Sequence, residues 1–225
     1  MEEWKSKTAG MSLLWQGSEK MTIKILNLYA GIGGNRKLWG GDIEVTAIEN
    51  NEDIAKIYQH FFPNDKVIIA DAHQYLLEHF REYDFIWTSP PCPTHSRARK
   101  LLSIKTDSLG NKYEQNKPVF PDMKLYEEIL LLQGYFKGKF VVENVVAWYE
   151  PLIEPQIIAK HFFWSNFVIT PIENKSREHD SSIEILQQRK GFDLTQFSKI
   201  DKKTILRNCV EPEVGLHILN EGLKT

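Results

Sequence analysis

Short apolar runs alternate with amphipathic stretches through most of the chain, and this alternation restricts the fold more than any other feature of the sequence. The apolar runs predict strands at 23–29, 44–49, 66–70, 84–88 and 140–142, with one or two more within 162–170. The amphipathic stretches predict helices at 51–61, 72–80, 123–136 and 152–160. Strands that alternate with helices need crossover connections and form a parallel sheet. The sequence therefore predicts an α/β fold with a doubly wound, mostly parallel sheet.

The length of 225 residues suits one domain with a small appendage. We expect a leader at 1–20, a main domain at 21–170, the appendage at 171–203, and a C-terminal segment at 204–225 that packs back on the domain. Residues 97–122 are polar, basic and rich in turn residues, which predicts a long mobile loop. A loop of that length in a compact domain is usually functional or disordered.

The composition excludes several classes of protein. Hydrophobic residues make up 42% of the chain and charged residues 26%, which excludes collagen, low-complexity disorder and disulfide scaffolds. No apolar run approaches the roughly 20 residues that cross a bilayer, and no secretory signal is visible. With only two cysteines, Cys92 and Cys209, these features predict a protein of the reducing cytoplasm, with no membrane contact.

The net charge of −2 argues against a protein that binds polyanions over its whole surface, but it allows a local basic face. Basic residues gather in two stretches: Arg97, Arg99, Lys100 and Lys105, then Lys199, Lys202, Lys203 and Arg207. On charge alone a solvated surface is the favoured interpretation of both stretches.

A glycine-rich turn at 31–34 follows the first predicted strand. Glycines there let a ligand approach the backbone closely, although a simple tight turn has the same composition. The second strand ends in Glu49, a carboxylate placed to accept hydrogen bonds from a ribose, and the third is followed by Asp71. These features meet at one sheet edge and predict an adenosine-type cofactor. Because the turn does not read G-x-G-x-x-G, S-adenosyl-L-methionine is favoured over NAD.

Cys92 lies just after the fourth predicted strand, on a turn stiffened by Pro90, Pro91 and Pro93. Most free cysteines are small buried apolar residues, but a cysteine between prolines in a polar loop is poorly placed for the core. The position therefore favours a nucleophile at the carboxyl edge of the sheet. A Cys–His hydrolase that uses His95 is the weaker alternative, because nothing indicates a third orienting group or an oxyanion site.

Glu143 ends the fifth predicted strand and should face the same edge as Cys92. A lone carboxylate after a strand often caps a helix, but Asn144 would cap equally well. The capping interpretation therefore leaves Glu143 unexplained.

Taken together, these motifs resemble the cytosine-C5 DNA methyltransferases. The glycine turn is similar to their cofactor motif, Pro91-Cys92 to their catalytic motif, and Glu143-Asn144-Val145 to their base-contacting motif. Residues 207–212 resemble the last motif of the family. The resemblance covers roughly residues 23–170 and 204–222, and the combination is specific although each motif alone is not.

Several positions depart from the family pattern. Asn27 replaces the usual aspartate of the glycine motif, Tyr29 the usual phenylalanine, and Pro93 a common glutamine. Arg207 stands where glycine is usual in the last motif. The paired-arginine motif is not found, and Lys160 and His161 stand about where it should be.

The resemblance implies S-adenosyl-L-methionine as cofactor and double-stranded DNA as partner, with no metal. It implies Cys92 and Glu143 as catalytic residues. The implied cofactor contacts are Tyr29, Ala30, Gly31, Ile32, Gly33, Gly34, Glu49, Asn50, Asp71, Ala72, Pro90, Asn208 and Val210. The implied nucleic-acid contacts are Pro91, Ser96, Arg97, Arg99, Lys100 and Asn144.

The resemblance further implies that Cys92 adds to carbon 6 of a flipped-out cytosine, with Glu143 at N3 and the exocyclic amine. Residues 171–203 would then be a reduced target-recognition segment, a build similar to small phage or prophage members in a bacterial or phage-infected cell. A monomer is expected. A tRNA cytosine-C5 methyltransferase and an inactive DNA-binding or DNA-protecting module are the alternatives, and the presence of both Cys92 and Glu143 argues against the second.

Overall fold

The computed structural model describes residues 22–97, 104–106, 109–114, 119–172 and 182–224. The expected leader at 1–20 lies outside these residues. The strands are β1 (Ile23–Leu28), β2 (Ile43–Glu49), β3 (Lys66–Ile69), β4 (Phe85–Thr88), β5 (Ile104–Thr106), β6 (Lys112–Glu114), β7 (Lys139–Val145), β8 (Gln156–Ile158) and β9 (His161–Ser165). The α-helices are α1 (Glu52–Phe61), α2 (Ala72–His79), α4 (Lys124–Tyr135), α5 (Ile183–Lys190), α6 (Lys202–Asn208) and α7 (Pro212–Leu223), with a 3-10 turn η1 (Phe80–Glu82) after α2.

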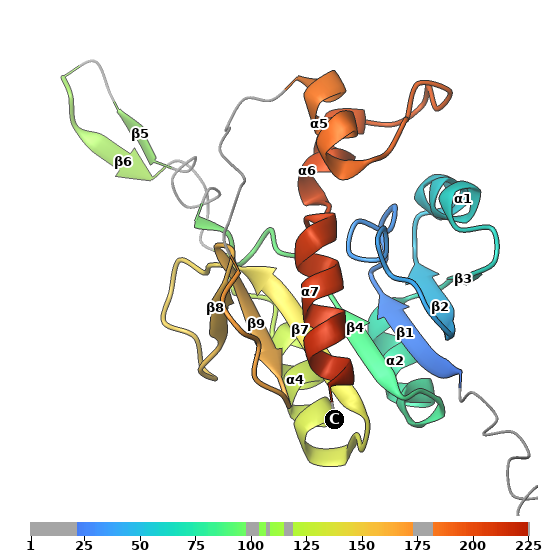
Figure 1. The fold of residues 1–225 in the computed structure, drawn as a ribbon. Coiled ribbons are helices and arrows are strands. Elements are labelled where there is room, and N and C mark those ends of the chain that lie inside the picture. Colours follow the sequence, from blue (N-terminus) through green and yellow to red (C-terminus); the bar gives the residue numbers. More distant parts are fainter. Residues whose placement is uncertain (1–21, 98–103, 107–108, 115–118, 173–181, 225) are drawn as a thin grey trace, which may run out of the picture.

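One seven-stranded sheet organises the chain, in the order β3-β2-β1-β4-β7-β9-β8. The first five strands in this order are mutually parallel, whereas β9 runs antiparallel to β7 and β8 antiparallel to β9. The strand order reverses between β1 and β4, which is where sheets of this kind bind their ligands. The predicted α/β fold with a mostly parallel sheet is confirmed (Figure 1).

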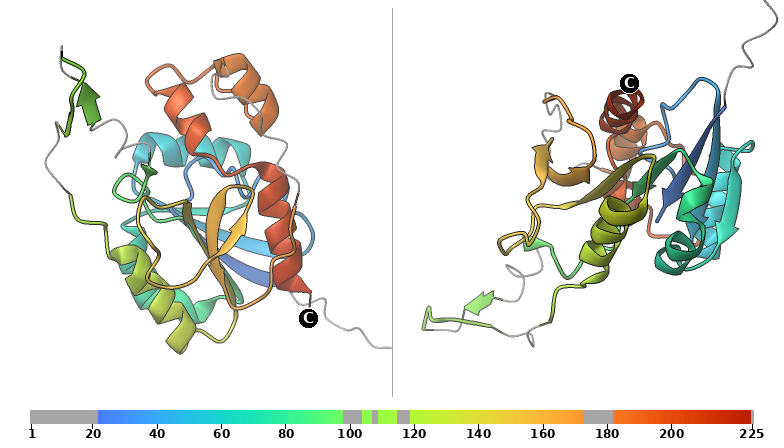
Figure 2. Two further views of the ribbon diagram at one scale, coloured as in Figure 1. Left: turned by 90° about the vertical axis from the view of Figure 1, so that its left-hand side faces the viewer. Right: turned by 90° about the horizontal axis from the view of Figure 1, so that it is seen from below.

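Alternation along the strands divides the core between the two faces of the sheet. Leu26 and Ile86 pack with α2 and α4, while their neighbours Ile25 and Phe85 pack in the cluster that contains α7. Figure 2 shows α7 on one side of the sheet and α4 on the other. The strands β1, β2, β4 and β7 are buried on both faces, as parallel strands covered by helices are, whereas the edge strand β3 is more exposed.

The segment predicted as a helix at 152–160 contains β8 instead. Pro155 disfavours helical backbone in the residue before it and lacks the amide that a helix interior needs. Ala159 and Lys160 then turn the chain through left-handed backbone, with φ of 48° and 68°, and β9 returns along β8. The spacing of apolar residues, on which the helix prediction rested, does not reveal the effect of the proline or the left-handed turn.

The described part of residues 97–122, predicted as a long mobile loop, contains two short strands. β5 and β6 pair antiparallel within this stretch, with Ile104 opposite Glu114. The strands are short and polar, so their alternation is too brief to stand out in the sequence.

Residues 182–203, the larger described part of the expected appendage, pack on the main domain. Ser182 caps α5 by accepting a hydrogen bond from the Ile185 amide, and Gly191 ends it with a φ of 69°. Leu186 of α5 joins a buried cluster with Ile57 and Tyr58 of α1. α6 crosses the expected boundary between residues 203 and 204, so no structural break falls there.

No helix among the residues that the structure describes is long and apolar enough to span a membrane.

Candidate active site at the carboxyl edge of the sheet

Five parallel strands end at one edge, and each is followed by a residue singled out in the sequence. The glycine turn follows β1, Glu49 ends β2, Asp71 follows β3, and Cys92 follows β4. Glu143 lies near the end of β7. We call residues 29–34 the cofactor loop and residues 89–97 the nucleophile loop. The fold therefore brings the three predicted motifs to one side of the molecule.

The glycines of the cofactor loop serve two different purposes. A side chain at Gly33 would collide with Phe62, and one at Gly34 would lie 2.7 Å from both Cys209 Cβ and the Val210 carbonyl oxygen. These two glycines allow close packing. Gly31 has a φ of 55°, and a Cβ there would meet no atom within 4 Å. The space over Gly31 is thus open to a ligand.

Glu49 fixes this loop from the β2 side. Its Oε2 accepts the Gly31 amide at 3.0 Å and its Oε1 accepts the Asn51 amide at 2.9 Å. Each carboxylate oxygen can accept a further bond. An adenosine-type group, with its ribose hydroxyls as donors, fits this open space beside a carboxylate.

The other predicted cofactor contacts vary in exposure. Asp71 is exposed and caps α2 by accepting the Gln74 amide at 2.9 Å, while the following Ala72 is buried. Asn50 and Asn208 are exposed, Pro90 is buried, and Val210 is half-buried beside Gly34. Ala30 and Ile32 are buried in the loop itself.

Tyr29, the first residue of the cofactor loop, is anchored to α4 by its hydroxyl. Its backbone has a φ of 53°, and its hydroxyl donates to Oε1 of Glu128 at 2.6 Å. Burial first, and then the charge of Glu128, raise the pKa of Tyr29 well above its ordinary value. The hydroxyl therefore stays a donor at physiological pH.

The nucleophile loop is a tight turn held against the end of β7. The Cys92 carbonyl accepts the amides of His95 and Ser96, both at 3.0 Å, and Ser96 bridges to Ala147. The buried Asn144 donates its side-chain amide to the Pro90 carbonyl at 2.9 Å. Its Oδ1 accepts the Val145 amide at 3.0 Å, so both ends of this side chain are engaged within the protein.

Cys92 is half-buried and interacts electrostatically with Glu143. Burial is the main cause that raises the pKa of the Cys92 thiol above its ordinary value, and the negative charge of Glu143 is the second. Glu143 is itself 8% exposed. The predicted nucleophile and this carboxylate therefore interact at the carboxyl edge of the sheet.

His161 is also brought to this site. It lies opposite Val145 in the β7–β9 pairing, and its Nε2 is 3.9 Å from Oε1 of Glu143. The sequence placed His161 only near a missing arginine motif. Its contact with Glu143 depends on the strand register.

His95 is a buried residue with a structural partner. Its Nδ1 lies 2.6 Å from the Tyr149 hydroxyl, and burial lowers its pKa. This bond directs the ring toward Tyr149 and gives no support to the Cys–His hydrolase interpretation.

The first basic stretch is only partly described, whereas the second lies within the described residues. Arg97 is exposed and donates its Nε to the Ala147 carbonyl at 2.9 Å. Arg99 and Lys100 lie outside the described residues, as does the side chain of Lys105. Pro91 is exposed and Ser96 half-buried, both on the nucleophile loop.

Glu128 is a site-related residue that sequence reasoning missed. It is 1% exposed and bonds to Tyr29, His73 and Thr88. A charged residue on the apolar stripe of the helix predicted at 123–136 was the available signal. Among the described residues, no group of three His, Cys, Asp or Glu side chains is arranged to hold a metal ion.

Comparisons with known proteins agree with the motifs. The family described as C-5 cytosine-specific DNA methylase matches residues 23–114. A tRNA (cytosine(38)-C(5))-methyltransferase from Spodoptera frugiperda is 34% identical over 89 residues, which cover 36% of this chain and 26% of that protein. This chain thus spans about a quarter of that relative's length. The family match confirms the resemblance inferred from the motifs over residues 23–114.

Similar solved structures include DNMT2 from Spodoptera frugiperda, at 25% identity and a TM-score of 0.36, covering 55% of this chain and 35% of that one. Another is a putative DNA modification methyltransferase encoded within an Escherichia coli prophage, at 17% identity and a TM-score of 0.35, covering 57% and 33%.

Proposed function

We propose that this chain, whose residues 23–114 match the C-5 cytosine-specific DNA methylase family, methylates carbon 5 of cytosine in DNA. The observation that carries the proposal is the meeting of Cys92 and Glu143 beside the open cofactor loop. Cys92 follows β4 and Glu143 lies near the end of the neighbouring parallel strand β7, and the charge of Glu143 acts on the Cys92 thiol, so we expect both groups to face one base.

Methyltransferases of this family use S-adenosyl-L-methionine, which supplies an electrophilic methyl group when bound. In the proposed site, Glu49 would accept hydrogen bonds from the ribose, and the open space over Gly31 would admit the cofactor against the backbone. Asp71, which follows β3 and caps α2, is exposed. The remaining predicted contacts would line this cradle.

The Cys92 thiolate would form a bond to carbon 6 of cytosine, which makes carbon 5 nucleophilic. Glu143 would hold N3 and the exocyclic amine as charge develops on the ring. After methylation, loss of the carbon-5 proton to a base restores the ring double bond and expels the Cys92 sulfur. The sulfur leaves as the Cys92 thiolate with which the reaction began, and the carbon-5 proton stays on the base that accepted it.

The target base must leave the duplex before Cys92 can reach it, at a cost of a few kcal/mol. Pro91, Ser96 and Arg97, on the nucleophile loop, would contact the displaced strand, with Arg99 and Lys100 further along the chain. Asn144 would contribute by fixing the Pro90 carbonyl. Phosphate contacts position a strand but carry no sequence information.

Residues 171–203 would serve as a reduced target-recognition segment, with 21–170 as the catalytic and cofactor-binding domain. A short segment offers few base contacts, each worth about 1–3 kcal/mol, so we expect a short or relaxed target sequence. We place the activity in a monomer in a bacterial or phage-infected cytoplasm, in DNA modification of the restriction-modification kind.

Methylation of tRNA is the second candidate, because the similar curated protein from Spodoptera frugiperda is a tRNA methyltransferase. The two candidates share the cofactor, Cys92 and Glu143. They differ in the nucleic acid that the nucleophile loop and residues 171–203 would recognise.

The test is transfer of labelled methyl groups from S-adenosyl-L-methionine to duplex DNA and, in parallel, to tRNA. We expect label on DNA with the wild type and none with Cys92→Ser. Cys209→Ser is the matched control, because a serine hydroxyl can keep the hydrogen bond that Cys209 Sγ donates to the Ile205 carbonyl, so this variant should leave transfer intact. Label on tRNA alone would establish the second candidate, and label on neither substrate would refute the proposal.

A further inference from the structure

Glu128 is a buried carboxylate in the middle of an apolar helix face. Its side chain is 0% exposed, with Leu125, Ile129 and Leu132 of α4 buried around it. A buried charge is costly unless hydrogen bonds satisfy it, and an apolar residue usually packs at least as stably in such a position. The position therefore calls for a role beyond packing.

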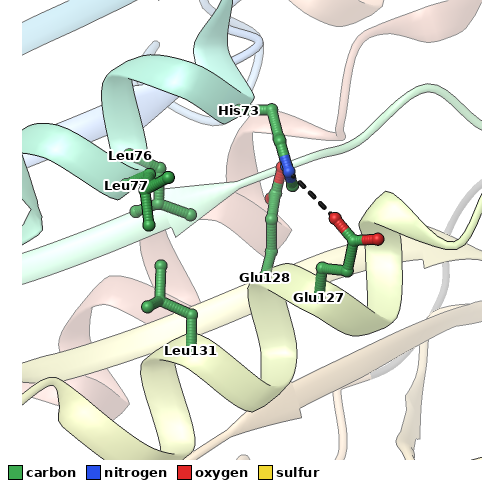
Figure 3. A pocket seen from close by; sticks show the side chains of 6 residues that line it. All are labelled: His73, Leu76, Leu77, Glu127, Glu128 and Leu131. Atoms are coloured by element: carbon green, nitrogen blue, oxygen red, sulfur yellow. Dashed lines mark hydrogen bonds and ion pairs between the residues drawn. The ribbon is translucent and has the colours of Figure 1, made fainter.

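Three hydrogen-bonding partners satisfy the Glu128 carboxylate. Oε1 accepts the Tyr29 hydroxyl at 2.6 Å and lies 3.0 Å from Nδ1 of His73. Oε2 accepts the Thr88 hydroxyl at 2.6 Å. Figure 3 shows Glu128 and Glu127 of α4 both pointing toward His73 of α2, beside the leucines of α2 and α4 that line a cavity of about 190 Å³.

These partners belong to the segments that form the site. Tyr29 is the first residue of the cofactor loop, and Thr88 directly precedes the nucleophile loop. His73 lies in the first turn of α2, two residues after Asp71. One side chain from α4 thus joins three strand ends that are far apart in the sequence.

The cofactor loop is held by two carboxylates, one from each side. Glu49 accepts the Gly31 amide, and Glu128 accepts the Tyr29 hydroxyl. Tyr29 adopts left-handed backbone, which costs energy for any residue other than glycine and persists only when the surroundings enforce it. The bond to Glu128 is a contact that enforces it.

We infer that Glu128 is a positioning residue of the proposed methyl-transfer site, where it holds the cofactor loop and the nucleophile loop in one fixed arrangement. The inference rests on the proposed function. Glu128 acts through Tyr29 and Thr88 and does not touch the reacting atoms.

Glu128→Gln tests this, because it keeps the shape of the side chain and removes its charge. Glu127→Gln is the matched control: Glu127 is the neighbouring residue on α4, is 62% exposed, and pairs with Nε2 of His73 at 3.1 Å. Calorimetry gives the Kd for S-adenosyl-L-methionine, and labelled transfer to nucleic acid gives kcat. We expect Glu128→Gln to raise this Kd about tenfold, on the scale of one lost charge-assisted hydrogen bond, and Glu127→Gln to change it less than about twofold.

The two hydroxyls should separate binding from chemistry. Tyr29→Phe should act mainly on the Kd for S-adenosyl-L-methionine, because it frees the cofactor loop. Thr88→Val should act mainly on kcat, because it frees the nucleophile loop. A purely structural role for Glu128 would not produce this split.

Equal Kd and kcat values for the Glu128→Gln and Glu127→Gln variants would overturn the inference. If Glu128→Gln does not fold, the two hydroxyl variants decide, and equal effects of both on Kd and kcat would also overturn it. A wild-type protein that binds no S-adenosyl-L-methionine would instead refute the proposed function.

Discussion

The Cys92 thiol of the free protein should be less acidic than an ordinary cysteine, and Glu143→Gln should make it more acidic. Burial is the largest cause that raises its pKa, and the charge of Glu143 is the second. A thiol with the ordinary value of 9.0 is about 3% thiolate at about pH 7.5, so Cys92 should lie below that fraction.

Because burial raises the pKa of Cys92 more than the charge of Glu143 does, Glu143→Gln can lower this pKa only in part. Glu143→Gln removes the second cause and leaves burial in place, so the pKa should fall without dropping below 9.0. Each tenfold gain in thiolate at neutral pH corresponds to about 1.4 kcal/mol. Because the pKa of Cys92 should not drop below 9.0, the thiolate fraction of Cys92 in the Glu143→Gln variant should not exceed that of an ordinary cysteine.

The assay is alkylation by iodoacetamide as a function of pH, with each cysteine followed by mass spectrometry. Cys209 is an internal control in the same chain, because burial raises its pKa to about 12 and Glu143 is not among the causes. We expect the midpoint of Cys92 alkylation to move down in the Glu143→Gln variant while Cys209 stays unreactive. An unmoved midpoint, or a wild-type midpoint below 9.0, would show that the reasoning is wrong.

Three further predictions concern stability, and unfolding in urea checks each. Asn144→Ala should cost about 1–3 kcal/mol, because it leaves the buried Pro90 carbonyl without its partner; no measurable loss would contradict this. Gly34→Ala should cost about 1–3 kcal/mol, because its Cβ would crowd Cys209 and the Val210 carbonyl. Gly40→Ala is its control, since a Cβ there meets no atom within 4 Å. The hydrogen bond to Glu128 raises the pKa of His73 above 6.5, so the stability that His73 contributes is full below about pH 6.5. That contribution is lost as pH rises through the higher folded-state value, so the stability difference from His73→Gln should stay full up to about pH 6.5 and shrink as the pH rises above it.

The strands of the parallel sheet could be predicted because each is a local apolar run bounded by turn residues. Placement of the glycine turn, Glu49 and Cys92 at one edge then follows from parallel topology alone. The helix predicted at 152–160 was wrong, because Pro155 and the left-handed turn at Ala159 and Lys160 outweigh apolar spacing. The local sequence pattern therefore predicts the ends of strands better than it predicts the backbone conformation of a short irregular segment.

The contacts within the site could not be predicted, because they join residues that are distant in the sequence. Glu128 meets Tyr29 across 99 positions and Thr88 across 40. The approach of His161 to Glu143 depends on the register of β9 against β7. A shift of one residue in this register would turn the His161 side chain to the other face of the sheet. The periodicity of the sequence predicts which face of a helix or strand is buried, but it does not predict which residues pack against that face.

The placement of Glu143 gives it two opposed effects within the proposed mechanism. In the free protein its charge disfavours the Cys92 thiolate, which protects the nucleophile from side reactions. A bound cytosine would donate a hydrogen bond from its exocyclic amine to the Glu143 carboxylate and draw its charge away from the sulfur. The thiolate would then form most readily when a base occupies the site. The carboxylate that recognises the base would thereby also control when the nucleophile is ready to attack it.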